Sequence, residues 1–172
     1  MTSANMSVWV GKNFACVKIA GRANFACSPD FKTLLDELVQ RGFGRFIIDL
    51  SECVLMDSTF LGVLAGFGIK LSPNGATITQ GIELHNPTVR VSELLENLGA
   101  AQLFTLTTGA LQLPRDATTC TPESINPTHE QITRTSLEAH QTLMAMSPEN
   151  EARFKDVAQF LAEDLKNIEK HS

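Results

Sequence analysis

The pattern of apolar and polar positions predicts strands and one helix in the first forty residues. Residues 8–10 and 14–19 are short runs rich in branched and aromatic side chains, and Gly11-Lys12-Asn13 lies between them. Such a pair of runs with a short turn predicts a β-hairpin. Apolar residues from Phe31 to Val39 then recur at helical spacing, which predicts a helix with one face in the core. Ser28-Pro29-Asp30 predicts its start, with the Ser28 hydroxyl as the cap.

The next two elements place a serine at a junction between a strand and a helix. Residues 46–50 are short and almost wholly apolar, as in an interior parallel strand. Residues 60–71 are apolar nearly all round and precede Pro73, which predicts a buried helix. Ser58 is therefore expected to cap this helix. A helix N-terminus also favours a phosphate group, so Ser58 is either an ordinary capping residue or a phosphate site.

Further elements follow in an alternating order. A turn is expected at residues 73–75, a strand at 76–80, a helix at 88–98 and a last short strand at 103–106. Alternating strands and helices imply βαβ units with parallel strands. With the N-terminal hairpin added, the predicted fold class is α/β, a mixed, partly parallel sheet with helices mainly on one face.

The C-terminal third of the chain changes character. Residues 107–128 contain three prolines and many threonines without periodicity, and are expected to be a linker between a domain at 1–106 and an extension at 129–172. The extension predicts an antiparallel helical hairpin, whose second helix starts at Ser147-Pro148-Glu149 and carries a long apolar stripe. That stripe is expected to pack on the same chain or on a partner, and a homodimer through these helices is one possibility.

Composition and charge narrow the classes of function. Of 172 residues, 43% are hydrophobic and 19% charged, with a formal net charge of -5. This balance argues against a nucleic-acid or anionic-membrane binder. We find no apolar stretch long enough to span a membrane and no signal-peptide pattern. The four cysteines lack C-x-x-C spacing, so we expect free thiols, no metal site, no cofactor and a cytoplasmic location.

Motifs of enzyme chemistry are weak. A serine hydrolase elbow requires glycines around the nucleophile, and Ser58 lacks them. His85 stands at a suitable position in the sequence for a base, but a lone histidine in a predicted loop is expected to be a surface residue. Asp49 and Asp57 are expected to be paired or hydrogen-bonded acids. The sequence therefore predicts a binding protein and not an enzyme.

The residues around Ser58 resemble the core motif of the STAS domain, the fold of bacterial anti-sigma factor antagonists. The resemblance rests on Ile48-Asp49-Leu50, on residues 56–64 with Asp57-Ser58-Thr59, and on residues 86–99. It extends over roughly residues 6–106. Phe60 departs from the pattern, because glycine is usual at that position.

This resemblance implies a function in partner switching. Ser58 matches the serine that a partner kinase phosphorylates, Thr59 is the second candidate hydroxyl, and Asp57 would position Ser58. The expected partners are a serine kinase that is also an anti-sigma factor and a cognate phosphatase. We expect the start of the helix at Asp57, Ser58 and Thr59 to contact the partner, together with the loop from Ser51 to Met56, which holds the apolar residues Val54, Leu55 and Met56. The alternative is that Val54 and Leu55 enter the core.

Two other functions agree with a STAS-like chain. One is a subunit of a phospholipid or anion transport system that acts without phosphorylation. The other is a small-molecule or lipid-binding regulator in which the C-terminal helices close over a groove.

Overall fold

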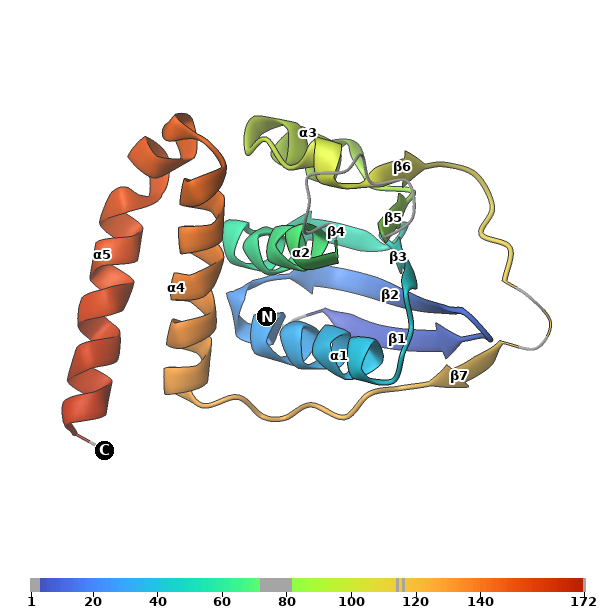
Figure 1. Ribbon diagram of the computed structural model, residues 1–172, viewed down its shortest axis with the longest axis horizontal. Helices are drawn as coiled ribbons and strands as arrows, with labels where there is room; N and C mark the ends of the chain where they lie inside the picture. Colours follow the sequence, from blue (N-terminus) through green and yellow to red (C-terminus); the bar gives the residue numbers. More distant parts are fainter. Residues whose placement is uncertain (1–3, 72–81, 114, 116, 172) are drawn as a thin grey trace.

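Seven strands in the described part of the chain form one mixed sheet (Figure 1). The computed structural model describes residues 4–71, 82–113, 115 and 117–171. The strands are β1 (Asn5–Val10), β2 (Phe14–Ala23), β3 (Arg45–Asp49), β4 (Cys53–Met56), β5 (Ile82–His85), β6 (Thr105–Thr107) and β7 (Thr118–Cys120). Their order is β6-β5-β3-β2-β1-β7, with β4 paired to β2. Since β2 is antiparallel to β1 and parallel to β3, the predicted mixed sheet is confirmed.

The helices that connect these strands lie on one face of the sheet. They are α1 (Ser28–Gln40), α2 (Ser58–Leu71) and α3 (Val89–Asn97), with two short 3-10 turns, η1 (Phe25–Cys27) and η2 (Ala101–Leu103). Val17 of β2 and Ile48 of β3 point into the cluster formed with these helices. Cys16 and Ile47, their neighbours in sequence, point to the opposite face, where Leu111 packs on them. This division follows from the two-residue period of a strand.

The N-terminal hairpin and the first helix form as predicted except at the cap. The turn is closed by a hydrogen bond from Gly11 N to Phe14 O at 3.0 Å. Ser28 does not cap α1, because the 3-10 turn η1 leads directly into the helix and Ser28 already has helical backbone angles. Its hydroxyl donates instead to the Phe25 carbonyl at 2.7 Å.

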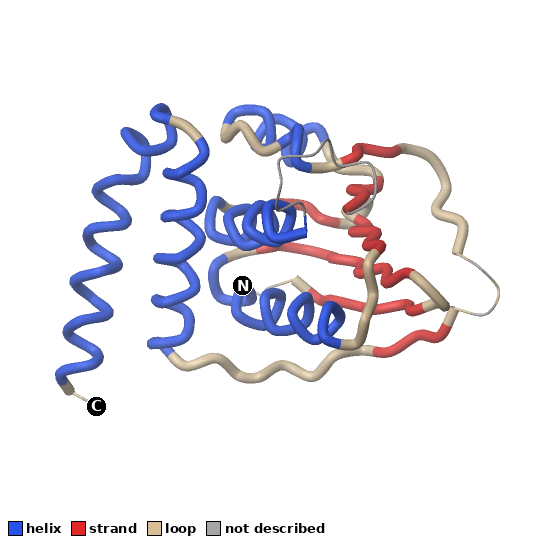
Figure 2. The backbone as a smooth tube through the Cα atoms, viewed as in Figure 1, coloured by secondary structure: helices blue, strands red, loops and turns tan. Residues whose placement is uncertain are grey.

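The segment after β6 contains a strand that the sequence did not predict. β7 pairs antiparallel with β1, from Val8 opposite Cys120 to Val10 opposite Thr118. The following residues run along α1 to the C-terminal helices, as the tan tube in Figure 2 shows. The Asp30 carboxylate of α1 accepts hydrogen bonds from Ser124 Oγ and Ile125 N, both at 2.7 Å. These hydrogen bonds hold this part of the predicted linker against α1.

Helices α4 (His129–Met146) and α5 (Pro148–Lys170) form the predicted antiparallel pair, called here the C-terminal hairpin. Thr128 and Gln131 make a capping box at the start of α4, and Ser147 caps α5. α4 contacts α2 and α1, and α5 lies on the far side of α4 (Figure 1). Of the two expected arrangements, packing on the same chain is therefore the one observed. The predicted turn at 73–75 and strand at 76–80 lie outside the described residues.

Candidate functional site

The junction between β4 and α2 is built around Asp57. Its Oδ1 accepts from Phe60 N at 2.9 Å, and its carbonyl accepts from Leu61 N at 3.0 Å. Asp57 is therefore the cap of α2, and the prediction that Ser58 caps this helix is wrong. The helix begins at Ser58, two residues before the predicted start at residue 60, so Ser58 stands at its first position. The Asp57 carboxylate is favoured at the cap position, because it faces the positive end of the helix dipole.

Asp57 also joins the junction to the end of β2. Its Oδ2 accepts from Phe25 N at 2.6 Å. Burial raises the pKa of this carboxyl above 3.8, while the N–H groups of Phe60 and Phe25 and the nearby His140 act in the opposite direction. Because the pKa is higher in the folded chain, ionisation of Asp57 lowers stability as pH rises above 3.8 and through the raised value. The ionised Asp57 carboxylate thus lowers stability at neutral pH, but its hydrogen bonds join the start of α2 to the segment that follows β2.

Ser58 contacts a histidine of the C-terminal hairpin. Ser58 Oγ lies 3.0 Å from His140 Nε2, and His140 Nδ1 lies 2.7 Å from the Ser136 carbonyl oxygen. A carbonyl can only accept, so Nδ1 carries a proton and donates to it. In the neutral imidazole Nε2 is then the acceptor, and the Ser58 hydroxyl donates to it. The half-buried serine and the buried histidine are 82 residues apart in sequence, and no sequence signal pointed to His140.

The Ser58–His140 hydrogen bond does not make a hydrolase site. A nucleophile and a base are paired in this way in serine hydrolases, where a third group, usually an acid, orients the base. Here the second nitrogen of His140 binds the carbonyl of Ser136 on its own helix. The glycines of a nucleophile elbow are also missing from the sequence around Ser58. The geometry is that of a contact between α4 and α2.

The two residues that follow Ser58, Thr59 and Phe60, face the interior. Thr59 is buried, so Ser58 is the more accessible of the two candidate hydroxyls. Phe60 is fully buried, and its ring stacks on Phe31 with centroids 4.3 Å apart. The bulky residue that replaces the usual glycine therefore fills the core and does not project beside Ser58.

The segment before the junction is partly a strand. Residues 51–56 were predicted as a loop, but β4 occupies Cys53–Met56 and pairs with the end of β2. Val54 is 61% exposed and Leu55 36% exposed, so the alternative that both enter the core is wrong. Met56, at the end of β4, is buried. Phe25, which the sequence analysis missed, is also exposed beside the junction and adds to the apolar surface.

His85 is not the surface residue that we expected. It lies buried on β5, where Nε2 donates to the Gly109 carbonyl at 3.0 Å. Nδ1 is then the acceptor for the Thr107 hydroxyl at 2.9 Å. His85 therefore joins β5 to the end of β6 and takes no part in the Ser58 site.

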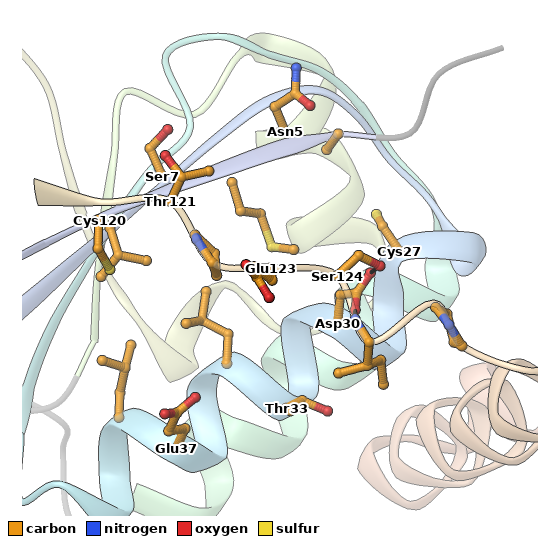
Figure 3. A pocket seen from close by; sticks show the side chains of 18 of the residues that line it. Asn5, Ser7, Cys27, Asp30, Thr33, Glu37, Cys120, Thr121, Glu123 and Ser124 are labelled. Atoms are coloured by element: carbon orange, nitrogen blue, oxygen red, sulfur yellow. Dashed lines mark hydrogen bonds between the residues drawn. The ribbon is translucent and has the colours of Figure 1, made fainter.

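Two clefts do not include Ser58 in their lining. One, of about 1220 Å³, lies between α1, β1 and residues 120–127 (Figure 3). The other, of about 420 Å³, lies between α1, α2 and α4. No group of three or more His, Cys, Asp or Glu side chains in the described ranges is arranged to hold a metal ion. Within those same ranges, no helix has the length and apolar character required to cross a membrane.

Comparison with known proteins supports the fold. The family model of the STAS domain matches residues 6–110. The structure is similar to that of the anti-sigma factor antagonist SpoIIAA in its unphosphorylated form, with 13% identity over 63% of this chain and 89% of that one and a TM-score of 0.52. It is also similar to TM1081 of Thermotoga maritima, described as a candidate anti-sigma factor antagonist, with 20% identity over 58% and 83% and a TM-score of 0.51. At these identities the likeness shows a shared fold. A search of curated proteins gave no match.

Proposed function

This chain belongs to the STAS domain family, and from that premise we propose that it is a cytoplasmic protein-binding module, an anti-sigma factor antagonist controlled by phosphorylation of Ser58. The observation that carries the proposal is the position of Ser58 at the start of α2, directly after the cap residue Asp57. The first turn of a helix has free N–H groups and a positive dipole end, which together accommodate a phosphate. Thr59, the neighbouring hydroxyl, is buried.

Phosphorylation would act through charge. The γ-phosphoryl group of ATP is transferred to Ser58 Oγ, the hydroxyl proton passes to a base of the kinase, and ADP leaves. The product carries about -1.5 to -2 charges at pH 7. In the proposed cycle, the unphosphorylated chain binds the kinase, which is also the anti-sigma factor, and so frees the sigma factor. The phosphate then dissociates the complex, and a phosphatase restores the hydroxyl.

The cysteines support a reducing compartment. Cys16, Cys27 and Cys53 are buried free thiols. Burial raises the pKa of Cys16 to about 12, and it also raises the pKa of Cys27 and Cys53. Thiols of this kind are inert and typical of proteins outside oxidising compartments.

We expect phosphate on Ser58 and not on Thr59. The purified chain is incubated with ATP and an extract of the cells that make it, and the modified residue is mapped by mass spectrometry. Ser58→Ala should remove the modification, whereas Thr59→Ala should retain it, because the buried hydroxyl of Thr59 is out of reach. Phosphate confined to other residues would contradict the proposal. Ser58→Asp should mimic phosphate only in part, since it has less charge and fewer acceptor oxygens.

Val54 and Leu55 are proposed to contact the kinase, because they are exposed apolar residues beside Ser58. Leu55→Arg should weaken kinase binding by at least about tenfold, as loss of a central apolar contact does. Leu106→Arg is the matched control, since Leu106 is 43% exposed and lies on the edge strand β6, which does not pair with β4. Calorimetric titration of the co-purifying kinase measures both. Equal affinity of the Leu55 variant and the unmodified chain would remove β4 from the interface.

The larger cleft favours a second candidate function, a small-molecule-binding regulator. It combines apolar walls from Met6, Leu34 and Leu38 with the carboxylates of Asp30 and Glu37. Residues 120–127 also line it, and the C-terminal helices contribute Ile132. Native mass spectrometry of the protein purified from its own cells tests this function, because a retained small molecule would add a defined mass.

A further inference from the structure

α4 and α2 meet at a point where only glycine fits. A Cβ atom built on Gly62 of α2 would lie 2.6 Å from the carbonyl oxygen and 2.7 Å from the Cβ of Ala139 on α4. Both distances are shorter than the contacts that Cβ atoms make in proteins. The two helices can approach this closely only because Gly62 lacks a side chain. Gly62 is one helical turn after Ser58, and His140, which binds Ser58, directly follows Ala139. The close approach and the Ser58–His140 hydrogen bond therefore belong to one contact.

Contacts between α4 and α5 join the two helices of the C-terminal hairpin to each other. The rings of His140 and Phe154 pack edge to face with centroids 5.1 Å apart, which joins α4 to α5. Arg134 of α4 also pairs with Glu169 of α5 at 3.0 Å. Residues 121–128, which precede α4, are neither helix nor strand. The hairpin can therefore move away as one body without breaking a strand pair of the sheet, but it must give up the hydrogen bonds from Asn150 to Leu98 and from Arg153 to Asn97.

The contacts between the hairpin and the helices α1 and α2 include a small number of polar links. Lys32 of α1 pairs with Glu138 of α4 at 2.8 Å, and both side chains are about half exposed. The Ser58–His140 hydrogen bond is the second link. Exposed ion pairs contribute little to stability. These links orient the hairpin on α2, and release of the hairpin must also expose the side chains of Leu143 and Phe154, which belong to the main core cluster.

We propose that the C-terminal hairpin is an internal inhibitor of the Ser58 site. The inference rests on the proposed function and adds its regulation. In the docked state α4 covers the start of α2, and the Ser58 hydroxyl donates its hydrogen bond to His140. A kinase must bring the γ-phosphorus of ATP into line with Oγ and take the hydroxyl proton, and α4 and His140 occupy the positions that both steps require. Ser58 is therefore phosphorylated only in molecules whose hairpin has lifted, and the rate scales with their fraction.

Gly62→Ala tests this proposal with the full chain. The added methyl group clashes with Ala139 and should lift α4, while α2 itself should remain helical because alanine is the better helix former. We expect amide hydrogen exchange in α4 to become at least about tenfold faster, and phosphorylation of Ser58 by cell extract and ATP to accelerate by at least about tenfold. Gly66→Ala is the matched control. Its Cβ would lie 3.7 Å from Thr142, an ordinary contact, so both rates should stay unchanged.

A charge exchange provides the second variant, since it avoids the packed helix interface. Glu138→Lys places two lysines together and should speed both α4 exchange and Ser58 phosphorylation several-fold. The double variant Lys32→Glu with Glu138→Lys restores an ion pair and should return both rates toward those of the unmodified chain. Failure of the double variant to restore them would contradict the docking role of this pair.

The outcomes separate the two proposals. Faster α4 exchange with an unchanged rate of Ser58 phosphorylation would overturn the inhibitory role and leave the proposed function standing. Faster α4 exchange with no phosphate on Ser58 in any variant would overturn the proposed function and the inhibition with it. Unchanged α4 exchange in Gly62→Ala would show that the hairpin does not depend on this contact, which also contradicts the inference.

Discussion

Replacing Phe60 by alanine is expected to lower the free energy of unfolding by about 3–5 kcal/mol, the range found for buried phenylalanines. Phe60 is fully buried in the main core cluster, and its ring stacks on the equally buried Phe31 with an interplanar angle of 14°. The substitution would leave a cavity below the first turn of α2 and remove the aromatic pair. Equilibrium unfolding in urea, followed by circular dichroism, measures the loss.

Phe160 offers a matched control for this experiment. It lies on α5 and is 68% exposed, so the same substitution removes a ring from solvent and should change stability by no more than about 0.5 kcal/mol. A loss below about 1 kcal/mol at Phe60 would mean that the core closes around the gap, contrary to the packing described. The result also bears on Ser58, because the first turn of α2 carries both residues.

Replacing Asn150 by aspartate is expected to cost about 3–5 kcal/mol, as for other unpaired buried charges. Asn150 is fully buried at the start of α5, and its Nδ2 donates to the carbonyls of Leu98 and Leu143, both at 2.9 Å. The bond to Leu98 joins the hairpin to the residue that follows α3, and the bond to Leu143 joins the start of α5 to α4. An aspartate would replace the donor by an oxygen that faces two carbonyl oxygens, so the contact would become repulsive.

Two controls and a pH series define the Asn150 result. Asn150→Ala should cost less than Asn150→Asp, because it loses the hydrogen bonds without adding charge. Asn97→Asp, at an exposed position near by, should cost no more than about 0.5 kcal/mol. Burial would raise the pKa of the new carboxyl, so the folded state would bind the extra proton, and the stability of Asn150→Asp should fall as pH rises. Equal stability of the two aspartate variants would contradict the role of Asn150.

The sequence by itself determined most of the secondary structure. Strand and helix periods arise from neighbouring residues, so the apolar runs at residues 14–19 and 46–50 and the stripes of α1 and α5 were sufficient to predict those elements. The position of Ser58 at a strand–helix junction followed for the same reason. The cap was assigned one residue too late, because both Asp57 and Ser58 are good capping residues and only the backbone angles decide between them.

The tertiary structure alone decided what surrounds Ser58. His140 reaches it across 82 residues of sequence, and no local pattern encodes a contact between two helices so far apart. β7 was missed because its threonines and cysteine have no apolar period; its pairing depends on the free hydrogen-bonding edge of β1. The apolar stripe of the hairpin predicted burial but not the surface that provides it. The stripe of α5 packs on α4, and α4 packs on α2 at the close fit between Gly62 and Ala139, a complementarity of shape that exists only once the helices are folded and face each other.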